Sequence, residues 1–259
     1  MVSRRLETPG PTHSRHERPR AERRPAGATP TSAQPSGTMS GMDLPSLLAR
    51  GRTAHVFALD DARVLRRYDG DEDATAEADV MAYLFTHGYP VPKVESASGP
   101  DIVMERIDGP TMLELLLDGR LEPAAAGVTL GELHTRLHAI PPGPGCPPAE
   151  RMLHLDLHPG NVMVGSRGPM VIDWCNARNG LPDLDIAVSA LILAGVIAGG
   201  HLAEAGAHEM LVRLLATAGG RPEHQLDEAA RMRAADPHLE PGEIALHDRA
   251  ASIVRAALP

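Results

Sequence analysis

The run His154-Leu155-Asp156-Leu157-His158-Pro159-Gly160-Asn161, followed along the chain by Val171-Ile172-Asp173-Trp174, decides how the rest of the sequence is interpreted. An aspartate, an asparagine five positions on and a second aspartate after a short hairpin form a set suited to phosphoryl transfer. Asp156 would orient an attacking hydroxyl and accept its proton, whereas the oxygens of Asn161 and Asp173 suit magnesium. Taken singly, these three are ordinary turn residues, so the prediction rests on their order.

The hydrophobic pattern on either side of this run predicts an α+β fold. A strand-rich region precedes it, and helices dominate after Gly109. We expect strands over 47–49, 55–59, 63–68, at 94 and over 102–104, a helix over 71–88, and a hairpin over 162–172. Further helices are expected over 111–117, 124–140 and, continuing to the end, 185–257. The predicted division is an antiparallel N-terminal lobe with one helix over 39–107 and a mostly helical C-terminal lobe over 108–259.

The order of these motifs resembles the aminoglycoside phosphotransferase and choline kinase-like family, whose members have a bilobal protein-kinase-like fold. The resemblance covers about residues 47–187. It implies that Asp156 is the catalytic base and that Asn161 and Asp173 are metal ligands. It also implies ATP and Mg²⁺ as cofactors, with transfer of the γ-phosphoryl group to a hydroxyl of a small molecule.

The same resemblance gives roles to neighbouring polar residues. His154 would brace the catalytic loop, and His158 would lie beside the substrate. Asp185, at the start of a long apolar stretch, matches a family aspartate that supports the loop through hydrogen bonds, whereas Asp183 is expected nearer the surface.

The resemblance extends to the strand over 63–68, where Arg66 occupies the place of the usual phosphate-binding lysine. Strand alternation puts Val64 and Arg66 on one face and Arg67 on the other. Arg66 would meet the α- and β-phosphates, and Glu77 would hold it. Met104-Glu105-Arg106-Ile107 resembles the hinge between the lobes, which implies that the Glu105 carbonyl and the Ile107 amide contact adenine.

Two departures from the family pattern concern the nucleotide. The chain lacks a GxGxxG loop, and its only lysine, Lys93, lies outside the expected phosphate-binding position. Arginine keeps the positive charge but is bulkier and reaches two oxygens at once. The alternative interpretation is therefore a catalytically weak or inactive nucleotide-binding pseudokinase.

Composition excludes several classes of protein. The 259 residues carry a net charge of −9. Residues 1–40 carry seven arginines and three glutamates, so the negative charge lies in residues 41–259, and a region this acidic argues against nucleic-acid binding. No apolar run is long enough to cross a membrane. Cys146 and Cys175 are expected to be reduced thiols of a cytoplasmic protein. Residues 1–38 read as a disordered basic tail, or as sequence upstream of a natural start at Met39 or Met42.

Other interpretations of the histidines remain. His154 and His158 could bind zinc in a metal-dependent hydrolase, but the Pro159-Gly160 pair disfavours a helix between them. His134 and His138 share helical spacing and are expected to serve packing or to lie at the surface. A protein substrate is disfavoured because the segment between Asp173 and Asp185 is too short for a long activation loop. The sequence specifies neither the acceptor nor the oligomeric state.

Overall fold

The computed structural model describes residues 46–51, 53–70, 73–143, 145–200, 204–236 and 241–259. The expected disordered tail over 1–38, and the start of the predicted N-terminal lobe, lie outside the described residues. Residues 44–259 form one compact unit.

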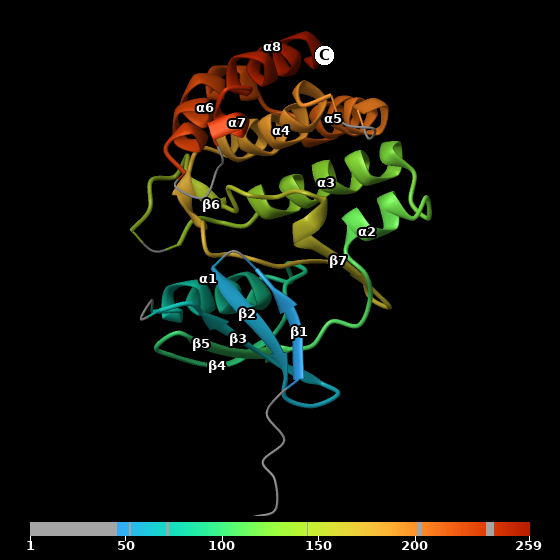
Figure 1. The fold of residues 1–259 in the computed structure, drawn as a ribbon. Coiled ribbons are helices and arrows are strands. Elements are labelled where there is room, and N and C mark those ends of the chain that lie inside the picture. Colours follow the sequence, from blue (N-terminus) through green and yellow to red (C-terminus); the bar gives the residue numbers. More distant parts are fainter. Residues whose placement is uncertain (1–45, 52, 71–72, 144, 201–203, 237–240) are drawn as a thin grey trace, which may run out of the picture. The chain divides into compact units, whose positions relative to one another are not determined.

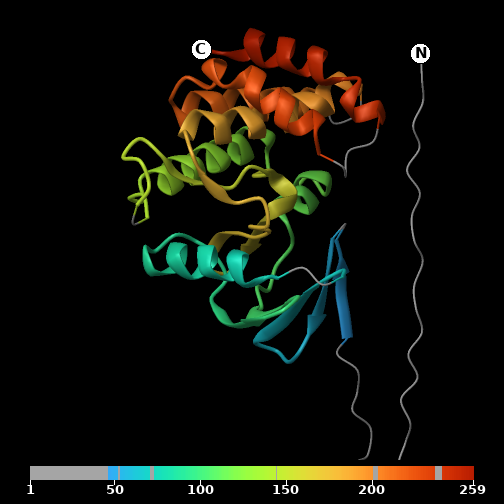
Figure 2. The ribbon, with the colours of Figure 1, turned by 90° about the vertical axis from the view of Figure 1, so that its left-hand side faces the viewer.

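The N-terminal part is an antiparallel five-stranded sheet in the order β1-β2-β3-β5-β4 (Figure 1). Helix α1 (Thr75–Thr86) follows β3 and lies on the side of the sheet that faces the helical region (Figures 1 and 2). Its face toward the sheet buries Ala78, Met81 and Leu84, while Phe85 remains exposed. The strands are β1 (Ser46–Arg50), β2 (Ala54–Ala58), β3 (Arg63–Tyr68), β4 (Val94–Ser98) and β5 (Asp101–Glu105).

Strand β3 at the centre of the sheet shows the predicted alternation. Val64, Arg66 and Tyr68 are buried on one face, whereas Arg67 is exposed and pairs with Asp101 on the other. The neighbouring strands fix the register of β3, since Val64 lies opposite Met104 of β5 and Ala58 of β2. The sheet thus directs Arg66 toward Glu77 of α1 and toward Asp173.

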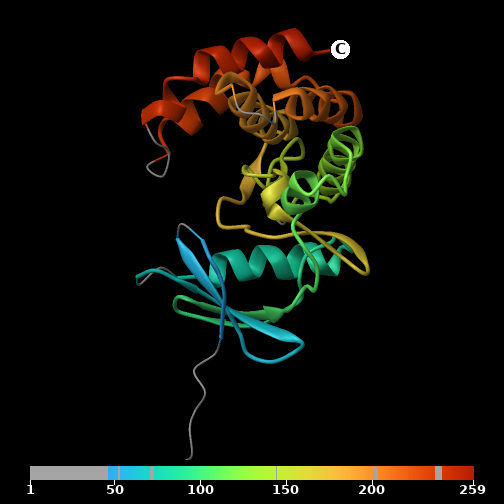
Figure 3. The same ribbon diagram turned by 45° about the vertical axis from the view of Figure 1, so that its right-hand side comes forward.

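The helical part surrounds a buried apolar helix, α4. Its first turn contains Pro182, which suits a helix start, and two aspartates that complement the helix dipole. Helices α5, α6 and α8 contact α4, and α3 packs closely on α5 through Gly127 and Gly131 (Figures 1 and 3). The helices are α2 (Met112–Leu117), α3 (Pro123–His138), α4 (Pro182–Ala198), α5 (Glu204–Ala218), α6 (Leu226–Ala234), α7 (Pro241–Ile244) and α8 (His247–Ala257).

Two small sheets hold the loops between α3 and α4. The hairpin β7 (Val162–Gly165) and β8 (Gly168–Val171) was predicted, whereas the pairing of β6 (Arg151–Leu153) with β9 (Arg178–Gly180) was not. Helix α4 also begins at Pro182, three residues before the predicted start. The α+β fold, with a small antiparallel sheet and a mostly helical remainder, is confirmed.

Candidate active site

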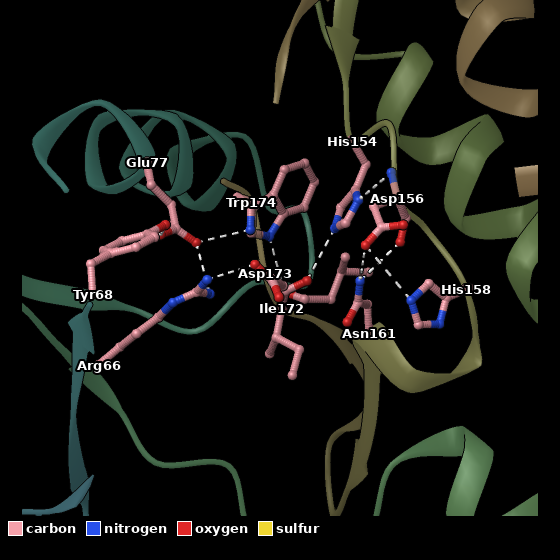
Figure 4. Close-up of polar contacts among 11 residues, drawn as sticks. Arg66, Tyr68, Glu77, His154, Asp156, His158, Asn161, Ile172, Asp173 and Trp174 are labelled. Carbon is pink, nitrogen blue, oxygen red and sulfur yellow. Dashed lines mark hydrogen bonds and ion pairs between the residues drawn. The ribbon is translucent and has the colours of Figure 1, made fainter. Parts of the chain in front are cut away.

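The loop after β6 brings Asp156 and Asn161 into direct contact (Figure 4). A short 3₁₀ turn over Pro159–Asn161 folds the chain back. The Asn161 Nδ2 group then donates to the backbone carbonyl of Asp156 at 2.9 Å and to its Oδ2 at 3.1 Å. Because the amide nitrogen faces Asp156, the Asn161 amide oxygen faces away from that carboxylate. Asn161 is buried, so its orientation is fixed by packing as well as by these bonds.

The following hairpin returns Asp173 to Asn161, as its spacing predicts. Val162 pairs with Val171 across β7 and β8, and the Ile172 amide donates to the Asn161 carbonyl at 3.0 Å. Asp173 comes next and adopts a left-handed backbone with φ of 65°. An amide oxygen and a carboxylate therefore belong to adjacent stretches of backbone, and both are groups that magnesium accepts.

The two histidines of the loop occupy different environments. His154 is completely buried, and its Nε2 donates to the Ile172 carbonyl at 3.0 Å, while its Nδ1 accepts from the Asp156 amide at 3.2 Å. Burial lowers the pKa of His154, which keeps the ring neutral. Both ring nitrogens are thus engaged, which argues against the zinc interpretation. His158 is partly exposed and directs Nε2 toward Asp156 Oδ2 at 3.7 Å, because its Nδ1 accepts from the Gly160 amide.

Asp185 supports the loop from the first turn of α4. Its carboxylate accepts from the Leu155 amide at 2.7 Å and from the His154 amide at 3.1 Å. These bonds hold Leu155 in a left-handed conformation with φ of 62°, which an ordinary side chain rarely adopts. Asp185 is fully buried, whereas Asp183 in the same turn is partly exposed, in agreement with the prediction.

His134 and His138 on α3 converge on Asp185. His138 Nε2 lies 3.0 Å from Asp185 Oδ2, and His134 Nδ1 lies 3.4 Å away without good hydrogen-bond geometry. His134 Nε2 contacts the Ser189 hydroxyl at 3.0 Å. Burial would raise the pKa of Asp185, but His134 and His138 outweigh it and hold that pKa well below its usual range. The three side chains could enclose a cation, yet backbone amides already use the carboxylate, so we interpret them as a hydrogen-bonding network.

Arg66 joins three separate elements of the structure. Its Nη1 donates to Glu77 Oε1 at 3.0 Å, and its Nη2 donates to Asp173 Oδ1 at 2.6 Å (Figure 4). Glu77 in turn accepts from the Tyr68 hydroxyl and from the Trp174 amide. Strand β3, helix α1 and the segment after β8 therefore meet at one buried guanidinium.

Burial and charge act in opposite directions on this cluster. Burial alone would lower the pKa of Arg66, but Asp173 and Glu77 outweigh it, so the pKa rises and the cation persists. Burial would raise the pKa of Asp173, and Arg66 again outweighs it and holds that pKa low. Glu77 is buried deeply enough that its pKa is raised, although Arg66 and the Tyr68 hydroxyl favour its charged form. Asp173 therefore stays charged, and a charged carboxylate is a ligand that a divalent cation accepts.

The remaining predicted residues lie along β3 and β5. Val64 and Met104 are buried opposite each other, and Ile107 is half-buried just beyond β5. The Glu105 side chain pairs with Arg167, so it does not turn toward Arg66.

Two polar residues near the site escaped prediction. Tyr68 shares the buried face of β3 with Arg66, and strand alternation would have identified it. Arg233 of α6 lies 4.0 Å from Asp156 Oδ1, and no local sequence pattern connects residues so far apart along the chain.

Comparison with known proteins assigns the family. A family model described as the phosphotransferase enzyme family matches residues 46–152 and 146–220, which together exceed half of the chain. The chain belongs to this family. Among curated proteins, it is 30% identical over 125 residues to the EKC/KEOPS complex subunit BUD32 of Encephalitozoon cuniculi (strain GB-M1). That match covers 48% of this chain and spans only 57% of the relative.

Solved structures of phosphotransferases share the fold. A choline/ethanolamine kinase family protein from Mesorhizobium loti superimposes with a TM-score of 0.52, at 14% identity, over 85% of this chain and 89% of that one. The gentamicin–APH(2")-IIa complex gives 0.53 at 14% identity, over 82% of this chain and 91% of that one. At these identities, the likeness establishes the fold alone. The helices of the described residues include none that is both long and apolar enough to span a membrane.

Proposed function

We propose that this phosphotransferase transfers the γ-phosphoryl group of ATP to a hydroxyl of a small molecule. The observation that carries the proposal is that the Asn161 side chain bonds Asp156, while the Asn161 backbone carbonyl bonds the Ile172 amide next to Asp173. An attacking hydroxyl that donates to Asp156 would stand next to phosphates bound at Arg66.

The nucleotide would bind along the N-terminal part, residues 39–107. Arg66 would hold the α- and β-phosphates, with Glu77 keeping its guanidinium in place. Val64 and Met104 would flank the adenine, with the Glu105 carbonyl and the Ile107 amide contacting its edge. Residues 108–259 would supply the catalytic loop and the acceptor site.

The proposed reaction forms one bond to phosphorus and breaks one. The hydroxyl oxygen forms a bond to the γ-phosphorus, the bond from that phosphorus to the bridging oxygen of ADP breaks, and Asp156 takes the hydroxyl proton. His154, neutral and bonded to both the Asp156 amide and Ile172, keeps the loop in position. Asn161 and Asp173 would hold Mg²⁺, which when bound neutralises charge on the phosphates. We further propose that the protein acts in the cytoplasm with Cys146 and Cys175 as free thiols.

ATP turnover with Mg²⁺, measured over a panel of hydroxylated small molecules, tests the proposal. Asp156→Ala should lower kcat by about 10²–10⁴-fold, the usual contribution of general-base catalysis, with little change in ATP binding. Asp118→Ala, which removes an exposed carboxylate at the end of α2, serves as the matched control and should leave kcat unchanged. Equal rates for Asp156→Ala and the wild type would reject the assignment.

One observation favours a pseudokinase as a second candidate. Arg66 is bonded directly to Asp173 at 2.6 Å, so the guanidinium occupies a carboxylate that a metal would need. Under this alternative, the protein binds ATP without turnover, and Asp156→Ala changes nothing measurable. The two candidates thus differ in ATP consumption, and calorimetric ATP binding alone does not separate them.

A further inference from the structure

The two oxygens of Asp156 face different neighbours. Oδ2 accepts from Asn161 Nδ2 at 3.1 Å and lies 3.7 Å from His158 Nε2. Oδ1 faces Nη1 of Arg233 at 4.0 Å. Since Oδ2 is already engaged by the catalytic loop, Oδ1 is the oxygen left for an incoming hydroxyl. Arg233 therefore lies on the acceptor side of the carboxylate.

Helix α6 directs Arg233 inward while its other charged residues pair elsewhere. The Arg233 side chain is 17% exposed, compared with 72% for Arg231 on the same helix. Arg231 pairs with Glu228, and Asp227 pairs with Arg255 of α8. Among the residues that the structure describes, the charged side chains paired with Asp156 are Arg233 and, when protonated, His158.

This arrangement sets the charge of an acceptor. A cationic group next to the reacting hydroxyl would meet the Arg233 guanidinium at short range in a partly desolvated position, which is unfavourable. A carboxylate or phosphate would instead accept two parallel hydrogen bonds from the same group. Five N–H donors allow an arginine to keep its protein contacts while binding an anion.

We propose that the acceptor carries an anionic group, a carboxylate or a phosphate, and that Arg233 binds it. The inference rests on the proposed function and names the substrate class of that site. Arg233 Nη1 lies 4.0 Å from Asp156 Oδ1, so with one hydrogen bond of about 3 Å to each group the anion lies within about 10 Å of the hydroxyl. Small hydroxy acids and sugar phosphates meet this requirement, whereas polycationic acceptors do not.

A matched panel tests the charge preference directly. Glycerate and gluconate represent carboxylates, ribose 5-phosphate and glycerol 3-phosphate represent phosphates, and glycerol and ribose are their uncharged counterparts. Choline and kanamycin represent cationic acceptors. We expect at least one of the anionic compounds to be phosphorylated. Its KM should be about tenfold or more below the KM of its uncharged counterpart, because a charge-assisted hydrogen bond contributes that much binding free energy. Whether the carboxylates or the phosphates are turned over shows which anionic group the protein recognises.

Arg233→Gln should raise the KM of the anionic acceptor by about 10–100-fold and leave the KM for ATP unchanged. Arg231→Gln, on the exposed face of the same helix, is the matched control and should change neither constant. Arg233→Lys, which keeps the charge, should recover part of the loss. A KM that rises equally for anionic and uncharged acceptors would indicate a structural role and overturn the proposal.

Calorimetric binding of the same anions to Asp156→Asn protein separates this inference from the proposed function. If anion binding disappears in the Asp156→Asn/Arg233→Gln double variant, and the wild type does not turn over ATP, the anion site is upheld and the enzymatic function is rejected. Turnover that prefers choline, kanamycin or the uncharged compounds upholds the enzyme and rejects the anion site. An absence of both turnover and anion binding rejects both.

Discussion

Replacement of Asp185 probes how a single buried carboxylate maintains the catalytic loop. This side chain is fully buried and accepts from the Leu155 amide at 2.7 Å, the His154 amide at 3.1 Å and His138 Nε2 at 3.0 Å. Asp185→Ala removes all three acceptor contacts. Asp185→Asn retains one oxygen for the backbone amides and replaces the other, which faces His138, with an NH₂ donor.

The expected cost follows from the donors left without partners. Each buried donor without a partner costs about 1–3 kcal/mol, so the two amides alone predict a loss of about 2–6 kcal/mol for Asp185→Ala. Asp185→Asn, which keeps those amides bonded, should lose about 1–2 kcal/mol for the exchange of a charged for a neutral acceptor. Asp183→Asn, in the same turn of α4 and bonded to one backbone amide at 2.9 Å, is the matched control and should lose less than either.

Urea unfolding of the three variants and the wild type, followed by circular dichroism, measures the free energy of unfolding. Activity adds a second readout, because release of Leu155 from its left-handed conformation would displace Asp156. We therefore expect Asp185→Ala to lower kcat more than it changes the KM for ATP. A loss below about 1 kcal/mol for Asp185→Ala would show that the amides find other partners, and the reasoning from unsatisfied donors would fail.

Three further outcomes follow from the same structure. Arg66→Lys should retain or raise turnover, because an ammonium group reaches one carboxylate at a time and releases Asp173 more readily. Steady-state kinetics measures the turnover, and its complete loss would mean that Arg66 has a role that lysine cannot fill. Gly109→Ala should destabilise the protein more than Gly99→Ala in thermal unfolding. Both glycines have a positive φ, but only at Gly109 would an added Cβ meet a neighbour, the Val164 carbonyl oxygen at 2.2 Å, so equal losses of stability would contradict this reasoning. The pKa of Asp185 is lowered in the folded state, so its contribution to stability is present above about pH 4 and is lost as pH falls toward the folded-state pKa. In urea titrations at decreasing pH, the free energy of unfolding should therefore fall more steeply for the wild type than for Asp185→Asn, and parallel curves would refute this.

Local patterns predicted the sheet and the core of the site. Strand alternation placed Val64 and Arg66 on one face, because side chains on a strand must alternate whatever surrounds them. The spacing between Asn161 and Asp173 predicted a hairpin, and the hairpin brings them together. The family resemblance, and not spacing, supplied the supporting role of Asp185.

Long-range contacts were beyond such patterns. The β6–β9 pairing joins two three-residue strands, which are too short to show alternation. Arg233 resembles any arginine of an amphipathic helix until α6 is placed beside the catalytic loop. The convergence of His134 on Asp185 likewise depends on how α3 packs against α4, which helical spacing does not determine.

The carboxylates of Asp156 and Asp173 are bonded by side chains from different portions of the chain. Asp156 Oδ2 is bonded by Asn161 of its own loop, whereas Asp173 Oδ1 is bonded by Arg66, 107 positions away. Mutations in β3 and α1 should therefore alter nucleotide preference without disturbing the acceptor side. Under the proposed function, a library confined to those two elements is the natural starting point for engineering a different phosphate donor, and drift of the gene could change donor and acceptor independently.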